Sequence, residues 1–157
     1  MVCKGFRNCH TSRQKIRNCN SCVEVSNTSK PTVKENRISY SIKNKNKQTS
    51  LTYVVDNGII RGVDHVRCDY LMMFPSCQKA FYIELKSQGW KKAIKQLENT
   101  YKLIHSQLNE YTPHFRAVVM QGVPRTNYVR LSNITKLIRS RHENATVMIK
   151  SRFNDVV

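Results

Sequence analysis

The segment VRCDYLMMFPSCQKAFYIELK, residues 66–86, sets the architecture that the sequence predicts. Its two apolar runs, Val66–Phe74 and Lys79–Lys86, are typical of β-strands. They flank Pro75-Ser76-Cys77-Gln78, which is rich in turn-forming residues. We therefore predict a β-hairpin in which Phe74 pairs with Lys79.

Two acidic residues face each other in this hairpin. Counting outward from the turn puts Asp69 opposite Glu84, with β-carbons about 4.5–5.5 Å apart. Lys86 lies two residues after Glu84 and so shares its face of the strand. Facing carboxylates repel, but a bound divalent cation reverses the sign of their interaction. Mg²⁺ takes such carboxylates together with water and phosphate oxygens, and a nearby lysine offsets charge on a phosphate group.

The order of these residues resembles a known superfamily. Asp69, followed on the next strand by Glu84-Leu85-Lys86, is similar to the motif of the PD-(D/E)xK metal-dependent nucleases. Cys68 stands where the motif has proline. The resemblance implies a restriction-endonuclease-like fold that binds Mg²⁺ or Mn²⁺. It implies that Asp69, Glu84 and the backbone carbonyl of Leu85 hold the metal, and that Lys86 orients the attacking water or neutralises charge.

A helix is predicted directly after the hairpin. Its apolar residues recur at steps of three and four, which indicates one buried face: Trp90, Ala93, Ile94, Leu97, Tyr101, Ile104 and Leu108. The resemblance, which covers roughly residues 54–108, suggests that a glutamine on this helix reaches the active site, and Gln96 is the candidate. Tyr101 follows Gln96 by five residues instead of the superfamily's usual four, so we interpret Tyr101 as a core residue.

Three more acids are candidates for a further metal ligand. The resemblance implies an acidic residue before the first core strand, for which Glu35 is the first choice and Glu24 the second. Asp56 belongs to Asp56-Asn57-Gly58, a strong hairpin-turn signal between the strand-like halves of residues 51–62. We favour a turn role for Asp56, with metal or water binding as the alternative.

The charge of the chain indicates a polyanionic partner. With 27 Lys and Arg against 10 Asp and Glu, the net charge of the 157 residues is +17. Nucleic acid is the expected partner, bound through its backbone with an affinity that falls as salt rises. DNA rather than RNA follows only from the resemblance. The other interpretations are an anionic membrane surface, association with ribosomes, and a basic composition that indicates no particular partner.

Residues 1–30 form a predicted Cys-rich, basic N-terminal extension. Cys19-Asn20-Ser21-Cys22 has the spacing of half a zinc site. Cys3 and Cys9, or Cys9 and His10, are candidates for the other ligands. Cys3, Cys9, Cys19 and Cys22 are therefore the predicted structural Zn²⁺ ligands. The alternative is a set of reduced thiols in a basic arm.

Residues 31–157 are predicted to form one nuclease-like α/β domain, with a central mixed β-sheet flanked by helices. Its further predicted elements are strands at Ile38–Ile42, 115–121 and Thr146–Lys150, a basic helix capped by Ser132 at Asn133–His142, and a loose tail at Ser151–Val157. The histidines, which show no metalloprotease or triad spacing, are expected to be structural or exposed: His10, His65, His105, His114 and His142. The sequence contains no membrane-spanning run or signal-peptide core, so an intracellular, cytoplasmic protein is expected.

The resulting hypothesis is a metal-dependent nuclease that hydrolyses phosphodiester bonds, of the kind found in defence, repair or mobile elements. One alternative is a non-catalytic, zinc-containing nucleic-acid-binding protein. Another is a nuclease subunit that acts only in a larger complex with an ATPase or helicase, and a homodimer is a further expectation. The first two hypotheses differ in the expected effect of removing a carboxylate. Asp69→Ala abolishes cleavage only if the protein is a nuclease.

Overall fold

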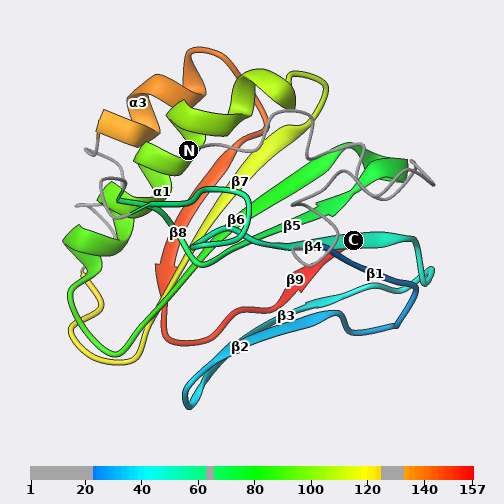
Figure 1. Ribbon diagram of the computed structural model, residues 1–157, viewed down its shortest axis with the longest axis horizontal. Helices are drawn as coiled ribbons and strands as arrows, with labels where there is room; N and C mark the ends of the chain where they lie inside the picture. Colours follow the sequence, from blue (N-terminus) through cyan, green and yellow to red (C-terminus); the bar gives the residue numbers. More distant parts are fainter. Residues whose placement is uncertain (1–22, 63–65, 125–132) are drawn as a thin grey trace.

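The structure is a computed structural model that describes residues 23–62, 66–124 and 133–157. It has three layers (Figure 1). A six-stranded sheet lies in the middle, helices α1 (Trp90–Ile104) and α3 (Asn133–Arg139) cover one face, and a three-stranded sheet covers the other. The predicted α/β class with a central mixed sheet is confirmed.

The six-stranded sheet combines a meander with two parallel strands. Its order is β1-β4-β5-β6-β7-β8. Each of the first four strands is antiparallel to its neighbour, while β7 and β8 run parallel to β6. The bounds are β1 Val23–Ser26, β4 Ser50–Val54, β5 Tyr70–Phe74, β6 Lys79–Lys86, β7 Thr112–Val119 and β8 Thr146–Lys150. Strand β1 lies within the predicted N-terminal extension, residues 1–30, yet it forms the edge of this sheet.

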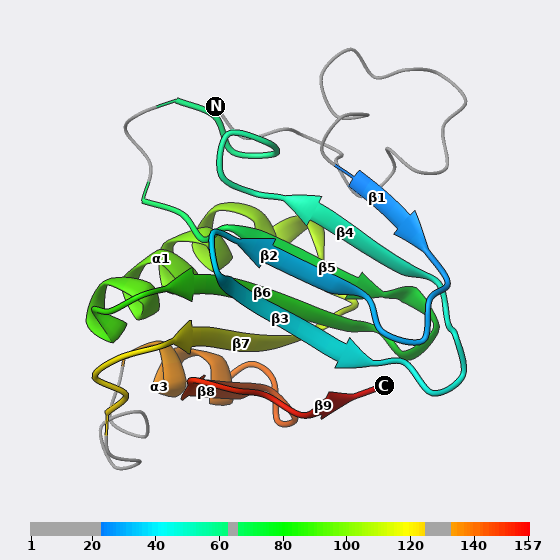
Figure 2. The ribbon, with the colours of Figure 1, turned by 90° about the horizontal axis from the view of Figure 1, so that it is seen from below.

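The second sheet corrects two expectations. It consists of β2 (Thr32–Glu35), β3 (Ile38–Lys43) and β9 (Asp155–Val156). Residues 151–157 are thus not a loose tail, because β9 pairs with β3 and Asp155 forms an ion pair with the buried Arg116. The main sheet also has described helices on one face only. Its other face is apolar and packs on β2 and β3 (Figure 2), so a second sheet buries it instead of helices.

The predicted core hairpin is confirmed in its register. Phe74 pairs with Lys79 across a 3-10 turn, η2 (Pro75–Cys77), and Gln78 takes a left-handed conformation at φ 50°. The first strand, however, begins at Tyr70 and not at Val66. The backbone N–H of Cys68 donates to Thr100 Oγ1 of α1 at 2.8 Å, so the chain before residue 69 is attached to the helix.

The hairpin predicted over residues 51–62 does not form. Strand β4 ends at Val54, and the backbone N–H groups of Ile59 and Ile60 bond back to carbonyls at residues 54 and 55. Both edges of β4 are already paired, with β1 and β5, so no edge remains for a returning strand. Asn57 has φ 56°, and a β-carbon on Gly58 would lie 1.9 Å from the carbonyl oxygen of Val54.

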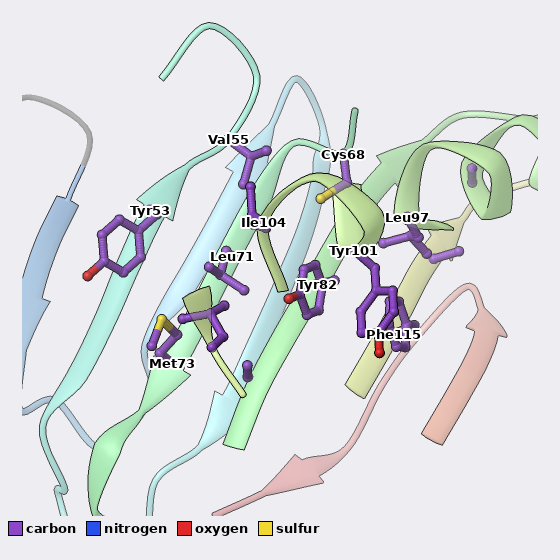
Figure 3. Packing of buried hydrophobic residues seen from close by; sticks show 14 of the residues in the cluster. Tyr53, Val55, Cys68, Leu71, Met73, Tyr82, Leu97, Tyr101, Ile104 and Phe115 are labelled. Atoms are coloured by element: carbon purple, nitrogen blue, oxygen red, sulfur yellow. The ribbon is translucent and has the colours of Figure 1, made fainter. Parts of the chain in front are cut away.

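The core lies between α1 and the main sheet (Figure 3). The apolar stripe of α1 packs there as predicted, although the helix ends at Ile104 and a 3-10 turn, η3 (His105–Gln107), follows. Both faces of β6 are buried: Tyr82 stacks on Phe115 at 5.0 Å, while Phe81 belongs to the cluster beneath the second sheet. Within the three described ranges, no helix is long and apolar enough to cross a membrane.

Candidate active site

Asp69 and Glu84 meet at the end of the core hairpin. The last ladder pair is Tyr70 with Ile83, so the next position outward places Asp69 against Glu84, as the sequence predicts. Asp69 Oδ2 accepts a hydrogen bond from the backbone N–H of Leu85 at 2.7 Å. This bond holds the Asp69 carboxylate over the carboxyl end of β6, beside the predicted site residues.

The carboxyl group of Glu84 is buried beside Lys86. Its side chain is fully buried, and Lys86 Nζ lies 2.6 Å from Oε1. Apart from this ion pair with Lys86, neither carboxyl oxygen of Glu84 has a hydrogen-bond partner among the described residues. Burial and the neighbouring Asp69 raise the pKa of Glu84 to about 8, although Lys86 acts in the opposite direction.

Glu35 brings a third carboxyl group to this place from the second sheet. Glu35 is the last residue of β2, and the Tyr70 hydroxyl donates a hydrogen bond to the carbonyl of the adjacent Lys34 at 2.8 Å. The Glu35 carboxyl group lies close enough to Asp69 to affect the ionisation of that residue. The pKa of Asp69 is raised mainly by burial and further by Glu35, against the lowering effect of the Leu85 N–H. The first-choice additional acid therefore lies beside the pair.

The other two candidate acids lie elsewhere. Glu24 is exposed on β1, which β4 separates from β5. Asp56 sits in the turn after β4, where its Oδ1 lies 2.6 Å from Nε of the buried Arg67. The structure thus gives Asp56 a turn-stabilising partner, in agreement with the favoured interpretation.

Gln96 supports the segment that leads to Asp69. Its Nε2 donates to the backbone carbonyl of Arg67 at 2.8 Å, while its Oε1 is buried without a hydrogen-bond partner among the described residues. Thr100, one turn further along α1, holds Cys68. Gln96 therefore holds the backbone two residues before Asp69, and its contact with a substrate stays a prediction. Tyr101 is a core residue, as expected.

The donor set at this edge fits a hard divalent cation. Carboxylate oxygens are the ligands that Mg²⁺ and Mn²⁺ prefer, and the buried Glu84 carboxyl group has Lys86 as its ion-pair partner but no neutral hydrogen-bond donor among the described residues. In the described part of the chain, no three His, Cys, Asp or Glu side chains are grouped closely enough to hold a metal as they stand. Metal binding at this edge therefore requires side-chain adjustment.

Leu85 and four cysteines are the other predicted metal ligands. The N–H of Leu85 is bound to Asp69, and metal binding by its carbonyl stays a prediction. Cys3, Cys9, Cys19 and Cys22, the predicted zinc ligands, lie outside the described residues, as does His10.

No protein-family model, curated protein or solved structure matches the chain. The chemistry of this site is therefore argued from its own residues and their geometry.

Proposed function

We propose that this protein is a Mg²⁺- or Mn²⁺-dependent nuclease that hydrolyses phosphodiester bonds. The observation that carries the proposal is the buried Glu84 carboxyl group, which faces Asp69 and has Lys86 Nζ within 2.6 Å. DNA is the expected substrate ahead of RNA, as the resemblance to PD-(D/E)xK nucleases implies.

The energetic cost of the acid cluster supports a functional role. A buried carboxyl group with a raised pKa destabilises the folded chain at neutral pH, because the unfolded chain ionises that group freely. Titratable groups with strongly perturbed pKa values are concentrated at functional sites. Here Glu35, Asp69 and Glu84 come from three different strands or strand ends, and a cation would relieve their mutual repulsion.

The residues then have distinct roles. Asp69 and Glu84, with Glu35 beside them, would hold the metal, which when bound supplies an acidified water and a counter-charge for the phosphate. Lys86 can swing from Glu84 toward a phosphate oxygen or the attacking water, since its side chain is partly exposed. The Leu85 N–H keeps Asp69 oriented toward β6.

Basic residues near the site offer sequence-independent contacts to a phosphate backbone. Helix α1 starts four residues after Lys86, and its first turns expose Lys91, Lys92 and Lys95. In a chain of net charge +17, such contacts supply affinity that weakens with salt.

The test is cleavage of supercoiled plasmid and of single-stranded DNA with Mg²⁺, with Mn²⁺ and with EDTA. We expect metal-dependent cutting that Asp69→Asn and Lys86→Ala each reduce by about a hundredfold or more. Glu98 and Lys102 form an exposed ion pair on α1 at 2.8 Å, so Glu98→Gln and Lys102→Ala are the matched controls and should cut normally. Equal activity in Lys86→Ala and Lys102→Ala would refute the proposal.

A second candidate is a nucleic-acid-binding protein that does not cut by itself. It is favoured by Lys86, which already neutralises Glu84, and by the lack of a ready three-ligand metal group among the described residues. On this alternative the wild type shifts DNA on a gel without cleavage, and Asp69→Asn binds equally well or better. Cleavage that appears only after adding an ATPase or helicase partner would indicate a subunit of a larger complex. Gel filtration tests the expected homodimer.

A further inference from the structure

The second sheet has one face that is turned away from the main sheet (Figure 2). Side chains alternate along a strand, and Val33, Tyr40 and Ile42 are the buried ones that pack on the main sheet. The alternate positions therefore point outward. They carry hydroxyl and ammonium groups with one valine, and all are at least partly exposed: Thr32, Lys34, Ser39, Ser41, Lys43 and Val156.

Both acidic residues of the three strands lie on the inward side. Glu35 follows the inward-facing Val33 by two residues, and it lies close enough to Asp69 to raise the pKa of that carboxyl group. Asp155 is held by two nitrogen atoms of Arg116 in the main sheet, at 2.7 and 2.8 Å. The outward face of these strands is consequently positive, with no acidic side chain of its own.

Further cationic groups gather where β3 and β9 end. A pocket of about 870 Å³ lies there, and its lining includes Lys30, Lys43 and Lys45. The buried Asn44 donates its Nδ2 hydrogen atoms to two loop carbonyls at 3.0 and 2.7 Å, and its backbone N–H donates to the carbonyl of Ser29 at 2.9 Å. These bonds tie the loop that carries Lys30 to the end of β3, so the pocket is preformed.

The outward strand positions and the pocket together form what we call the basic face. Within the three described ranges, no acidic side chain forms an ion pair with a lysine of this face. Asp155, the only described acidic residue in the pocket lining, is already neutralised by Arg116 and accepts a hydrogen bond from the Tyr40 hydroxyl at 2.8 Å. Ammonium groups without a counter-charge attract anions, and phosphate groups are common partners of lysine. The lysines of the basic face are Lys30, Lys34, Lys43 and Lys45.

The basic face extends from the pocket to the acid cluster. Lys34 lies at the acid-cluster end, because Glu35 follows it and the Tyr70 hydroxyl donates to its carbonyl at 2.8 Å. In the register Lys34 pairs with Ser39, which precedes Lys43 by four residues on β3. At about 3.4 Å per residue, the two lysines are about 14 Å apart along the strands. This length equals about four steps of 3.4 Å along a nucleic-acid strand, so it suits a row of phosphate groups better than one small anion.

We propose that the basic face binds the phosphate backbone of a nucleic-acid strand and places that strand beside the acid cluster. Hydroxyl groups between the lysines donate hydrogen bonds to phosphate oxygens. A membrane surface fits less well, since peripheral binding needs apolar side chains that insert and Val156 is the one outward apolar residue of the three strands. The inference rests on the nucleic-acid substrate of the proposed function, but it does not require cleavage.

The test is binding of fluorescently labelled single-stranded and duplex DNA to the full chain, measured by anisotropy in EDTA from about 50 to 200 mM salt. The basic-face variant combines Lys34→Gln, Lys43→Gln and Lys45→Gln. The matched control removes three exposed charges on or just after α3, on the opposite side of the main sheet: Lys136→Gln, Arg139→Gln and Arg141→Gln. All six side chains are exposed, so both variants are expected to fold, and far-UV circular dichroism checks this.

The basic-face variant should bind DNA at least about tenfold more weakly. Each lost phosphate contact reduces the slope of log K against log salt by about 0.9 for duplex DNA, so the slope should fall by about 2–3. The control should keep the wild-type slope and affinity. If both variants lose affinity equally, or the basic-face variant loses none, DNA does not use this face and the proposal is wrong.

Vesicles that contain phosphatidylserine test the membrane alternative. If the basic-face variant loses vesicle binding but keeps DNA binding, the face binds membranes and the proposal is wrong. Cleavage is not measured in EDTA, so the two proposals are tested separately. A protein that binds DNA through this face and never cuts it supports the present inference and refutes the nuclease proposal alone.

Discussion

Replacing Glu84 by glutamine should stabilise the metal-free protein at alkaline pH. The pKa of Glu84 is raised from 4.5 to about 8 in the fold, so the folded chain holds this proton more tightly than the unfolded chain. The stability that the proton contributes is fully present below about pH 4.5 and is lost as the pH rises toward 8. Glutamine has a similar shape and no proton to lose, so it avoids this loss.

The magnitude follows from the shift. At about 1.4 kcal/mol per pKa unit, the free energy of unfolding of the wild type should fall by roughly 3 kcal/mol relative to Glu84→Gln between pH 5.5 and pH 8. His105 and His114 have pKa values lowered to about 4, so they change stability in the opposite direction over this range. Both proteins contain these histidines, and the difference between the two proteins removes their effect.

The assay is urea unfolding in EDTA at pH 5.5 and pH 8, followed by the fluorescence of Trp90, the only tryptophan. Saturating Mg²⁺ should recover stability in the wild type at pH 8 but not in Glu84→Gln, since the metal binds the ionised carboxylate. Glu98→Gln, at an exposed ion pair, is the matched control and should follow the wild type. If the difference in the free energy of unfolding between the wild type and Glu84→Gln is the same at pH 5.5 and pH 8, the reasoning is wrong.

Three stability predictions concern the scaffold, and each is checked by urea or thermal unfolding. Gly58→Ala should destabilise the fold by about 2 kcal/mol or more, because its β-carbon would lie 1.9 Å from the Val54 carbonyl oxygen and the turn must open. A normal Tm for this variant would contradict the turn geometry. Arg116→Met should cost about 3–5 kcal/mol, since it leaves Asp155 unpaired after loss of a bidentate contact at 2.7 and 2.8 Å. If adding Asp155→Leu to the Arg116→Met variant restores no stability, loss of the Arg116–Asp155 ion pair does not explain the destabilisation. Leu97→Ala should cost about 2–5 kcal/mol as a fully buried core residue of α1, whereas a cost below 1 kcal/mol would place Leu97 outside the core.

Sequence reasoning identified the core hairpin and most of the acid site. Alternation and the turn residues set the register of Phe74 with Lys79, and that register alone puts Asp69 against Glu84. It did not identify Glu35 as a neighbour by any local pattern. Glu35 is a candidate only through the superfamily resemblance, and the structure places it near enough to Asp69 to raise the pKa of that residue.

Other elements could not be predicted because they depend on long-range pairing. Residues 151–157 are short and show no clear periodicity. They are ordered by long-range contacts: β9 pairs with β3, Asp155 bonds Arg116, and Phe153 and Val157 pack against the core beneath the second sheet. The strand predicted after Asp56 does not form, because β1 and β5 already pair with the two edges of β4. A local sequence pattern cannot show which strand edges are already hydrogen-bonded to another strand.

The sequence by itself determined the periodicities: the hairpin, the apolar face of α1, the placing of Asp69, Glu84 and Lys86 at one strand end, and the net charge of +17. These depend on neighbours within a few residues, where strand and helix geometry fixes which side chains share a face. Tertiary structure alone decided that a second sheet covers the main sheet and that His105 meets His142, with their Nε2 atoms 3.1 Å apart. Such contacts join segments that are distant in sequence, and they form only where burial of apolar faces brings those segments together.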